Sequence, residues 1–280
     1  MMNRGLKTLL SSEALHREEQ QEEEKAESRL ELPEKLQSER FRLDQANLLR
    51  PPINSQARLV SLTECGSLGA EKFMLLAARL QQLRDQRQLK KVVLTSSVSH
   101  EGKSLLAANL ALSLAGSKQQ RVLLLEGDLR HPALSQVFGC VQPKGLTEAF
   151  YGKGSATRLL YRMDSPPLYL LFAGALRDRP LELLQSPQLI QLLAQLEQSF
   201  DWIVIDAPPV LPLADADLWT RLSDGVLLVV RENWTPRKIL QKALDNLDKR
   251  ALLGLVLNEA SGLDGSYCKE YQGRMARKNC

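Results

Sequence analysis

The chain has 280 residues, of which 44% are hydrophobic, and this is enough for one large folded domain with tails. Its formal net charge is +4, from 37 basic and 33 acidic residues, an excess too small to indicate a nucleic-acid-binding protein. No apolar stretch approaches the ~20 residues that a transmembrane helix needs. The four cysteines have no metal-binding spacing, which favours free thiols in a reducing compartment. We therefore expect a cytosolic globular protein.

The first 57 residues differ in composition from the rest and are predicted to form a charged N-terminal arm. Acidic residues gather over 18–24, and the Pro-Pro pair at 51–52 ends whatever precedes it. Such a segment is either a solvated helix or a flexible arm, and the composition leaves both open.

From residue 58 the chain alternates short apolar runs with helical stretches. We expect an extended segment over 58–63 and a helix over 68–83 whose apolar face packs on the domain core. Buried strands are predicted to begin at Lys91 and to cover 122–125, 168–173, 200–206, 226–230 and 253–257. Further helices are expected to begin near 104, to start over 180–186 and to cover 189–196. This alternation predicts an α/β domain over 58–262 with a doubly wound, mostly parallel sheet, followed by a basic tail over 263–280.

The first strand ends in a turn that carries Gly102, Lys103 and Ser104 at the start of a helix. The unpaired backbone N–H groups and the dipole of a helix N-terminus favour a phosphate there. A lysine in this turn adds a charge for the β- and γ-phosphates, and the following hydroxyl can ligate Mg²⁺. An ordinary strand–turn–helix has the same local pattern, so the assignment depends on the other turns.

Two further strands also end in polar turns, and both supply carboxylates. Glu126 and Asp128 follow one strand, and Asp206 ends another. Ligands of open α/β sheets bind beyond the carboxyl ends of the strands, where all three turns are expected to meet. A phosphate cradle, a metal-binding hydroxyl and several carboxylates are the groups that Mg-dependent phosphoryl transfer needs.

The three turns together resemble the bacterial tyrosine kinases of capsule and exopolysaccharide systems, which are relatives of the MinD and ParA P-loop ATPases. That family carries an SSxPGEGKS loop, a strand ending in DxDxR and a strand ending in DxPP, which stand here at 96–104, 126–130 and 206–209. A strand end of the form GxVxN stands at 254–258. The resemblance covers about 58–262 and implies a P-loop fold of the MinD/ParA type.

The resemblance also implies roles for individual residues. Lys103, Asp128 and Asp206 would be catalytic, with Asp128 activating the tyrosine hydroxyl. Mg²⁺ would be held by Ser104, Asp128 and Asp206. ATP would be bound by His100, Glu101, Gly102, Lys103, Ser104, Leu105 and Asn258, the last of these at the base. Tyr267 and Tyr271 in the tail would be phosphoacceptors, although two tyrosines in a basic tail are equally compatible with a plain disordered end.

The chain departs from the family pattern at four positions. His100 replaces a loop glycine, and glycine is usual where φ must be positive. Glu126 replaces an aspartate, and Mg²⁺ demands near-ideal geometry. Met74 and Ala77 replace the arginines of an ExxRxxR helix that the family uses in ring assembly.

Three functions therefore stay open. The first is an ATP-dependent protein-tyrosine autokinase that controls polysaccharide export. The second is a nucleotide-binding switch with weak catalysis in the same export complex. The third is a positioning ATPase of the MinD or ParA kind, whose signature lysine is replaced here by Val98.

The partners that the resemblance implies are a membrane chain-length regulator or adaptor protein, a tyrosine phosphatase and further copies of the chain in a homo-oligomer. Nucleic acid is not among them. Because no apolar span is found, we expect a cytoplasmic subunit that lies at the inner membrane through the adaptor.

Overall fold

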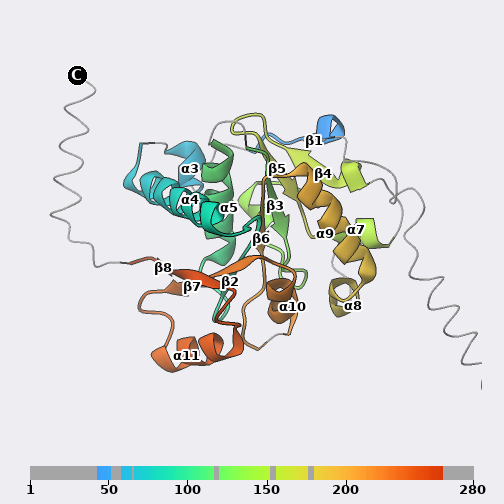
Figure 1. Ribbon diagram of the computed structural model, residues 1–280. Coiled ribbons are helices and arrows are strands. Elements are labelled where there is room, and N and C mark those ends of the chain that lie inside the picture. Colours follow the sequence, from blue (N-terminus) through green and yellow to red (C-terminus); the bar gives the residue numbers. More distant parts are fainter. Residues whose placement is uncertain are drawn as a thin grey trace, which may run out of the picture.

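The computed structural model describes residues 43–51, 58–64, 66–116, 120–151, 156–175, 180–212 and 214–260. One eight-stranded sheet runs through the described part of the chain, and helices cover both of its faces (Figure 1). The predicted arm up to residue 42 and the tail from residue 261, with Tyr267 and Tyr271, lie outside the described residues.

The strand order across the sheet is β1-β4-β5-β3-β6-β2-β7-β8. The strands are β1 (Asn47–Leu48), β2 (Lys91–Ser96), β3 (Val122–Glu126), β4 (Leu160–Arg162), β5 (Leu168–Leu171), β6 (Trp202–Asp206), β7 (Gly225–Arg231) and β8 (Leu252–Asn258). Only β4 and β5 pair in the antiparallel sense; the other neighbours are parallel. The predicted doubly wound, mostly parallel sheet is confirmed.

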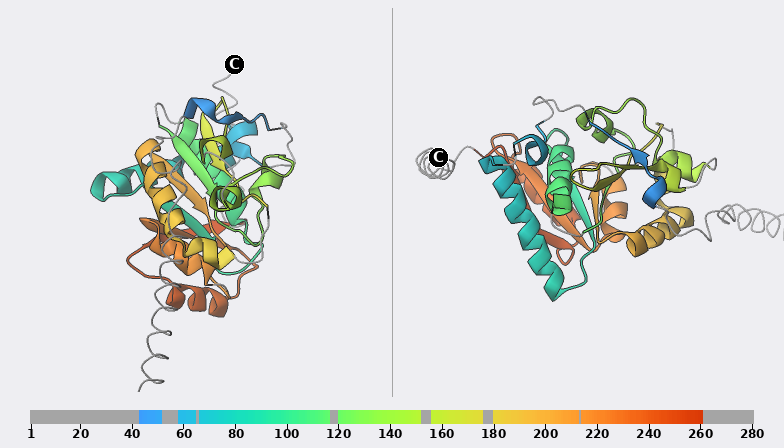
Figure 2. Two further views of the ribbon diagram at one scale, coloured as in Figure 1. Left: turned by 90° about the vertical axis from the view of Figure 1, so that its right-hand side faces the viewer. Right: turned by 90° about the horizontal axis from the view of Figure 1, so that it is seen from above.

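Helices form two layers around this sheet (Figure 2). They are α3 (Val60–Thr63), α4 (Leu68–Gln86), α5 (Lys103–Gly116), α6 (Leu134–Val137), α7 (Leu146–Phe150), α8 (Pro180–Leu184), α9 (Pro187–Ser199), α10 (Asp215–Arg221) and α11 (Arg237–Asn246), with short 3-10 turns η1 (Leu43–Gln45) and η3 (Ala156–Leu159). No helix in these described ranges is long and apolar enough to cross a lipid bilayer.

Two hydrophobic cores lie on opposite faces of the sheet. In β3, Leu123 and Leu125 face the core shared with α9 and α10, while Val122 and Leu124 face the core shared with α4 and α5. A strand buried on both faces is apolar along most of its length, on both sides. This is why β2, β3 and β6 appear in the sequence as continuous apolar runs without alternation.

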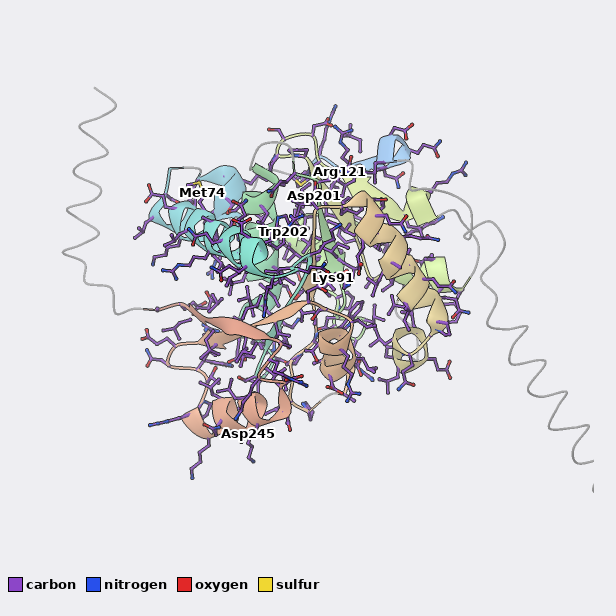
Figure 3. All side chains as sticks on the ribbon, viewed as in Figure 1. Met74, Lys91, Arg121, Asp201, Trp202 and Asp245 are labelled. Carbon is purple, nitrogen blue, oxygen red and sulfur yellow. The ribbon has the colours of Figure 1, made fainter. Side chains whose placement is uncertain are left out.

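Helix α4 packs on the core as predicted. Ser67 caps its N-terminus by accepting a hydrogen bond from the N–H group of Ala70. Leu80 and Ala77 are buried against α5, whereas Met74 is half exposed on the outer side (Figure 3). Ala77, which stands at one of the arginine positions of the family motif, is therefore a core residue.

The extended segment predicted over 58–63 is wrong, because residues Val60–Thr63 form the short helix α3. Asn109 of α5 explains the difference. Its side chain accepts a hydrogen bond from the N–H group of Ser61 (3.0 Å) and donates one to the carbonyl of Arg58 (3.1 Å). Leu59 is buried in the same place, so tertiary contacts with α5 fix the local conformation.

Charged side chains hold the amino ends of the central strands. Lys91 at the start of β2 pairs with Glu197 and lies 3.5 Å from Asp224, and Asp201 before β6 accepts from the N–H group of Arg121 (Figure 3). These contacts lie at the edge of the sheet opposite to the turns that carry the candidate site.

Candidate active site

The loop between β2 and α5 has the backbone conformation of a phosphate-binding turn. Two of its residues adopt positive φ angles, His100 at 67° and Gly102 at 88°. A Cβ atom at position 102 would come within 2.2 Å of the side-chain amide of Asn258, so only glycine fits there. His100 takes the left-handed conformation that glycine normally takes. It is exposed at the rim of the loop.

Glu101 fastens this loop to the rest of the domain. Its buried carboxylate accepts a hydrogen bond from the N–H group of Val98 (2.8 Å) and one from the hydroxyl of Thr235. Its carbonyl accepts a third from the amide of Asn258 (2.9 Å). The side chain and the carbonyl of Glu101 are therefore both engaged in contacts within the protein.

Lys103 is the first residue of α5 and is almost completely buried. Its ammonium group lies 2.9 Å from Oδ2 of Asp128 and 3.6 Å from Oδ1 of Asp206, and 3.4 Å from the hydroxyl of Ser104. The structure thus brings together the four side chains to which the sequence assigned catalysis and metal binding. Leu105 follows on α5 and packs partly buried against the core on that face.

Burial and charge act in opposite directions on these groups. Burial lowers the pKa of Lys103, but the attraction of Asp206 and Asp128 outweighs it, so the pKa lies above its ordinary value. Burial raises the pKa of Asp206, against the attraction of Lys103. Lys103 is therefore a cation at neutral pH, placed where a phosphate chain or two carboxylates can pair with it.

Asp128 is held in place from two sides. Its Oδ1 atom accepts a hydrogen bond from the N–H group of His131 (3.0 Å), and its Oδ2 atom accepts from Lys103. The backbone N–H groups of Gly127 and Asp128 both donate to the carbonyl of Asp206, at 2.8 and 3.0 Å. These bonds tie the turn after β3 to the end of β6 and set the spacing of the two carboxylates.

Glu126 lies beside Asp206 across the β3–β6 pair, but its carboxylate is bonded to backbone N–H groups. Its Oε1 atom accepts from the N–H group of Leu134 (2.6 Å) and its Oε2 atom from that of Ala173 (2.9 Å). Burial raises the pKa of Glu126 to about 7, against the lowering effect of these hydrogen bonds. The carboxylate thus joins α6 and the end of β5 to β3.

Three further residues of this edge were missed by the sequence analysis. Asp215 in α10 is buried and pairs with both Nε (2.7 Å) and Nη2 (3.2 Å) of Arg130. Arg231 and Thr235 both contact the loop at 100–101. Arg231 ends β7 and Thr235 follows it closely, so position in the chain was the available signal for these two, whereas Asp215 lies in α10 and had none.

The residues present fit a nucleotide-bound Mg²⁺ ion. No hydrogen bond of ordinary length within the described residues reaches the carboxylate of the buried Asp206, whose contact with Lys103 is an ion pair at 3.6 Å. In the same part of the chain, no three His, Cys, Asp or Glu side chains form a metal-binding group. Mg²⁺ in phosphoryl-transfer sites usually takes one or two carboxylates and completes its shell with phosphate and water. Asp206, Asp128 and Ser104 match that requirement.

Comparisons with known proteins agree with this geometry. No protein-family model matches the chain. The tyrosine-protein kinase YwqD of Bacillus subtilis is 32% identical over 205 residues, which cover 72% of this chain and 86% of YwqD. The chain belongs to the bacterial tyrosine-protein kinases. As a member of a kinase family, it is a nucleotide-using protein.

Two more comparisons bear on the extent of the similarity. The succinoglycan biosynthesis transport protein ExoP of Rhizobium meliloti is 31% identical over 195 residues, 68% of this chain but only 25% of ExoP. The crystal structure of the chimerical protein CapA2B2 matches with a TM-score of 0.69 and 25% identity, over 85% of this chain and 98% of that one. The structural similarity thus covers a larger share of the chain than either sequence match does.

Proposed function

We propose that the chain is an ATP-dependent protein-tyrosine kinase that transfers phosphate at the carboxyl edge of the sheet. The observation that carries this proposal is the position of Lys103. It begins the 14-residue helix α5 and faces Asp128 and Asp206 at the same time. A helix N-terminus and a buried cation are suited to a polyphosphate, and both carboxylates can serve as metal ligands, with Asp128 also acting as the base.

Each side chain has a task in this mechanism. Lys103 exchanges its carboxylate partners for the β- and γ-phosphates of ATP, which the backbone of residues 100–105 surrounds. Asp206, Asp128 and Ser104 would hold Mg²⁺, which supplies neutralisation of the phosphate charge. Asp128 accepts the proton of the tyrosine hydroxyl as its oxygen bonds to the γ-phosphorus. The bond between that phosphorus and the bridging oxygen breaks, and ADP leaves.

We propose Tyr267 and Tyr271 as the acceptors. A tail can reach the site of a neighbouring copy, whereas packed tyrosines cannot align their hydroxyl groups with the γ-phosphate. Tyr169 is buried, and the hydroxyl of Tyr161 accepts a hydrogen bond from the N–H group of Lys144. Tyr151 is the exposed tyrosine of the described part and serves as the internal alternative.

The cellular process proposed for this kinase is the synthesis and export of an exopolysaccharide. Support comes from ExoP, a relative whose name places it in succinoglycan biosynthesis and transport. In this setting the chain would be a cytoplasmic subunit that docks on a membrane adaptor of the chain-length-regulator kind. A tyrosine phosphatase would reverse its phosphorylation, and further copies would supply the tails.

A nucleotide-binding switch with weak catalysis is the second candidate. The observation that favours it is Glu126, which replaces an aspartate of the family pattern and whose two carboxylate oxygens accept hydrogen bonds from the backbone N–H groups of Leu134 and Ala173. Such a protein would bind nucleotide through the same loop and change its contacts with the adaptor without transferring phosphate.

Calorimetry with MgATP and a phosphotyrosine blot together separate these functions. We expect wild type and a Lys91→Met control to bind MgATP, because Lys91 lies at the opposite edge of the sheet, and we expect Lys103→Met not to bind. Phosphotyrosine in wild type but not in Lys103→Met supports the kinase. Binding without phosphotyrosine, even with an adaptor segment present, supports the switch. Absence of MgATP binding to wild type overturns both.

A further inference from the structure

Trp234 is an exposed aromatic side chain beside the phosphate-binding loop. It lies in the turn between β7 and α11, at the carboxyl edge of the sheet. The chain has three tryptophans, and Trp202 and Trp219 are completely buried, whereas Trp234 is 52% exposed.

Arg231 connects this ring to the loop. Its guanidinium group lies over the indole of Trp234, 5.1 Å from the ring centroid. The same group donates to the carbonyl of His100 (3.4 Å) and pairs with Glu259 at the end of β8. The indole and the rim of the loop therefore contact the same guanidinium group.

The turn that carries the ring is fixed at both ends. The N–H groups of Trp234 and Thr235 donate to the carbonyl of Arg231, at 3.3 and 3.2 Å. The hydroxyl of Thr235 donates to the buried carboxylate of Glu101, inside the loop itself. Because Arg231 and Thr235 both contact the loop, Trp234, which precedes Thr235 in the same turn, has little freedom to move away from it.

We propose that Trp234 is the stacking surface for the base of the bound nucleotide and favours a purine. The inference rests on the proposed nucleotide binding and adds a surface that contacts the base. With the phosphates at the N-terminus of α5, the nucleoside has to extend outward over the rim of the loop. There it meets an indole that has Arg231 over one face and half of its surface open. Every base has a π-face, and the larger ring system of a purine covers more of the indole.

The buried state of the other two tryptophans makes Trp234 a specific reporter. Iodide, a quencher that does not enter the core, should quench Trp234 and leave Trp202 and Trp219 untouched. Saturating MgATP is expected to protect Trp234 from iodide and to change its emission. Magnesium tripolyphosphate, which has no base, should bind without giving that protection.

Variants separate the stacking role from the optical signal. Trp234→Phe is expected to bind MgATP within about twofold of wild type but to lose the fluorescence change, because phenylalanine still stacks. Trp234→Ala should weaken MgATP binding about tenfold and leave tripolyphosphate binding unchanged. Tyr151→Ala, which removes another exposed aromatic ring after α7, is the matched control and should bind MgATP normally.

The outcomes that overturn the inference differ from those that overturn the function. If wild type binds MgATP but Trp234→Ala binds it equally well, or if MgATP and tripolyphosphate protect Trp234 to the same extent, the base does not stack there and the kinase proposal stands. If wild type binds no MgATP, or Lys103→Met binds it like wild type, the nucleotide site itself is wrong.

Discussion

Nζ of Lys103 lies 2.9 Å from Oδ2 of Asp128 in the interior of the protein. The same ammonium group is 3.6 Å from Oδ1 of Asp206, which is completely buried. One cation thus compensates two carboxylates, and it is also the cation that the proposed mechanism needs for the phosphates. On binding of a nucleotide with its metal ion, Lys103 would pair with the phosphates instead of the carboxylates. The charges of Asp128 and Asp206 would then be compensated by the metal ion.

The first prediction concerns stability in the absence of nucleotide. Lys103→Met is expected to lower the free energy of unfolding by about 3 kcal/mol, because it leaves two buried carboxylates without a cation. Urea denaturation measures the change. Adding Asp206→Asn to Lys103→Met should recover part of the loss, since one of the uncompensated charges is then gone. If Lys103→Met unfolds at the same urea concentration as wild type, the pairing contributes nothing to the fold.

The second prediction concerns the pH dependence of stability. The pKa of Glu126 is about 7 in the folded protein, against an ordinary value of 4.5. Between these two values the folded state binds the additional proton, so stability falls as the pH rises. Protonation of Glu126 contributes about 3 kcal/mol to the free energy of unfolding. This contribution is fully present below pH 4.5 and is lost above pH 7.

Comparison with Glu126→Gln isolates this contribution, because glutamine does not titrate. The advantage of wild type over the variant in free energy of unfolding should shrink as the pH rises from 5 to 8. Urea denaturation at several pH values measures it. A constant difference across that range would show that Glu126 keeps an ordinary pKa in the folded protein.

The parallel core of the fold could be predicted because its strands are buried on both faces. Val92–Leu94, Val122–Leu125 and Trp202–Ile205 are apolar at every position, which leaves no other place for them in a protein without a membrane-spanning helix in its described part. The outermost strands on the β1 side of the sheet could not be predicted. β1 has two residues and β4 has three, so neither shows a period, and β1 is held by Asn47, whose amide donates to the carbonyl of Arg158.

The candidate site was predictable to a similar extent. Lys103, Asp128 and Asp206 each follow an apolar strand, and the carboxyl ends of parallel strands lie at one edge. The hydrogen bonds of the Glu126 carboxylate could not be predicted. They go to the backbone N–H groups of Leu134 and Ala173, and no sequence pattern indicates which backbone groups a side chain will meet. The contacts of Arg231 and Thr235 with the loop likewise arise only when β7 lies beside β2.

The third prediction concerns the histidine in the loop. His100 has a φ of 67°, a conformation that costs an L-residue roughly 1 kcal/mol and costs glycine nothing. His100→Gly should therefore raise the free energy of unfolding by about 1 kcal/mol. His100→Val should lower it by at least as much, because β-branched residues rarely adopt positive φ. Both variants keep the backbone carbonyl that accepts from Arg231, so urea denaturation reports the local strain. Equal stability of the valine variant would be evidence that the loop adopts another conformation in solution.

The last prediction concerns the metal ion. Asp206 presents two buried carboxylate oxygens that no hydrogen bond of ordinary length reaches among the described residues, close to Lys103 and to Ser104 at the start of α5. If these oxygens bind Mg²⁺, then Asp206→Asn should remove the Mg²⁺ dependence of ADP binding and leave metal-free ADP binding within about threefold of wild type, because the loop and Lys103 still hold the phosphates. Calorimetric titration of ADP with and without Mg²⁺ gives both affinities. Asp201→Asn is the matched control, since Asp201 precedes the same strand at its amino end, and this variant should keep the full Mg²⁺ dependence. An Asp206→Asn protein whose ADP affinity still rises with Mg²⁺ as in wild type would place the metal ligand on another residue of the site.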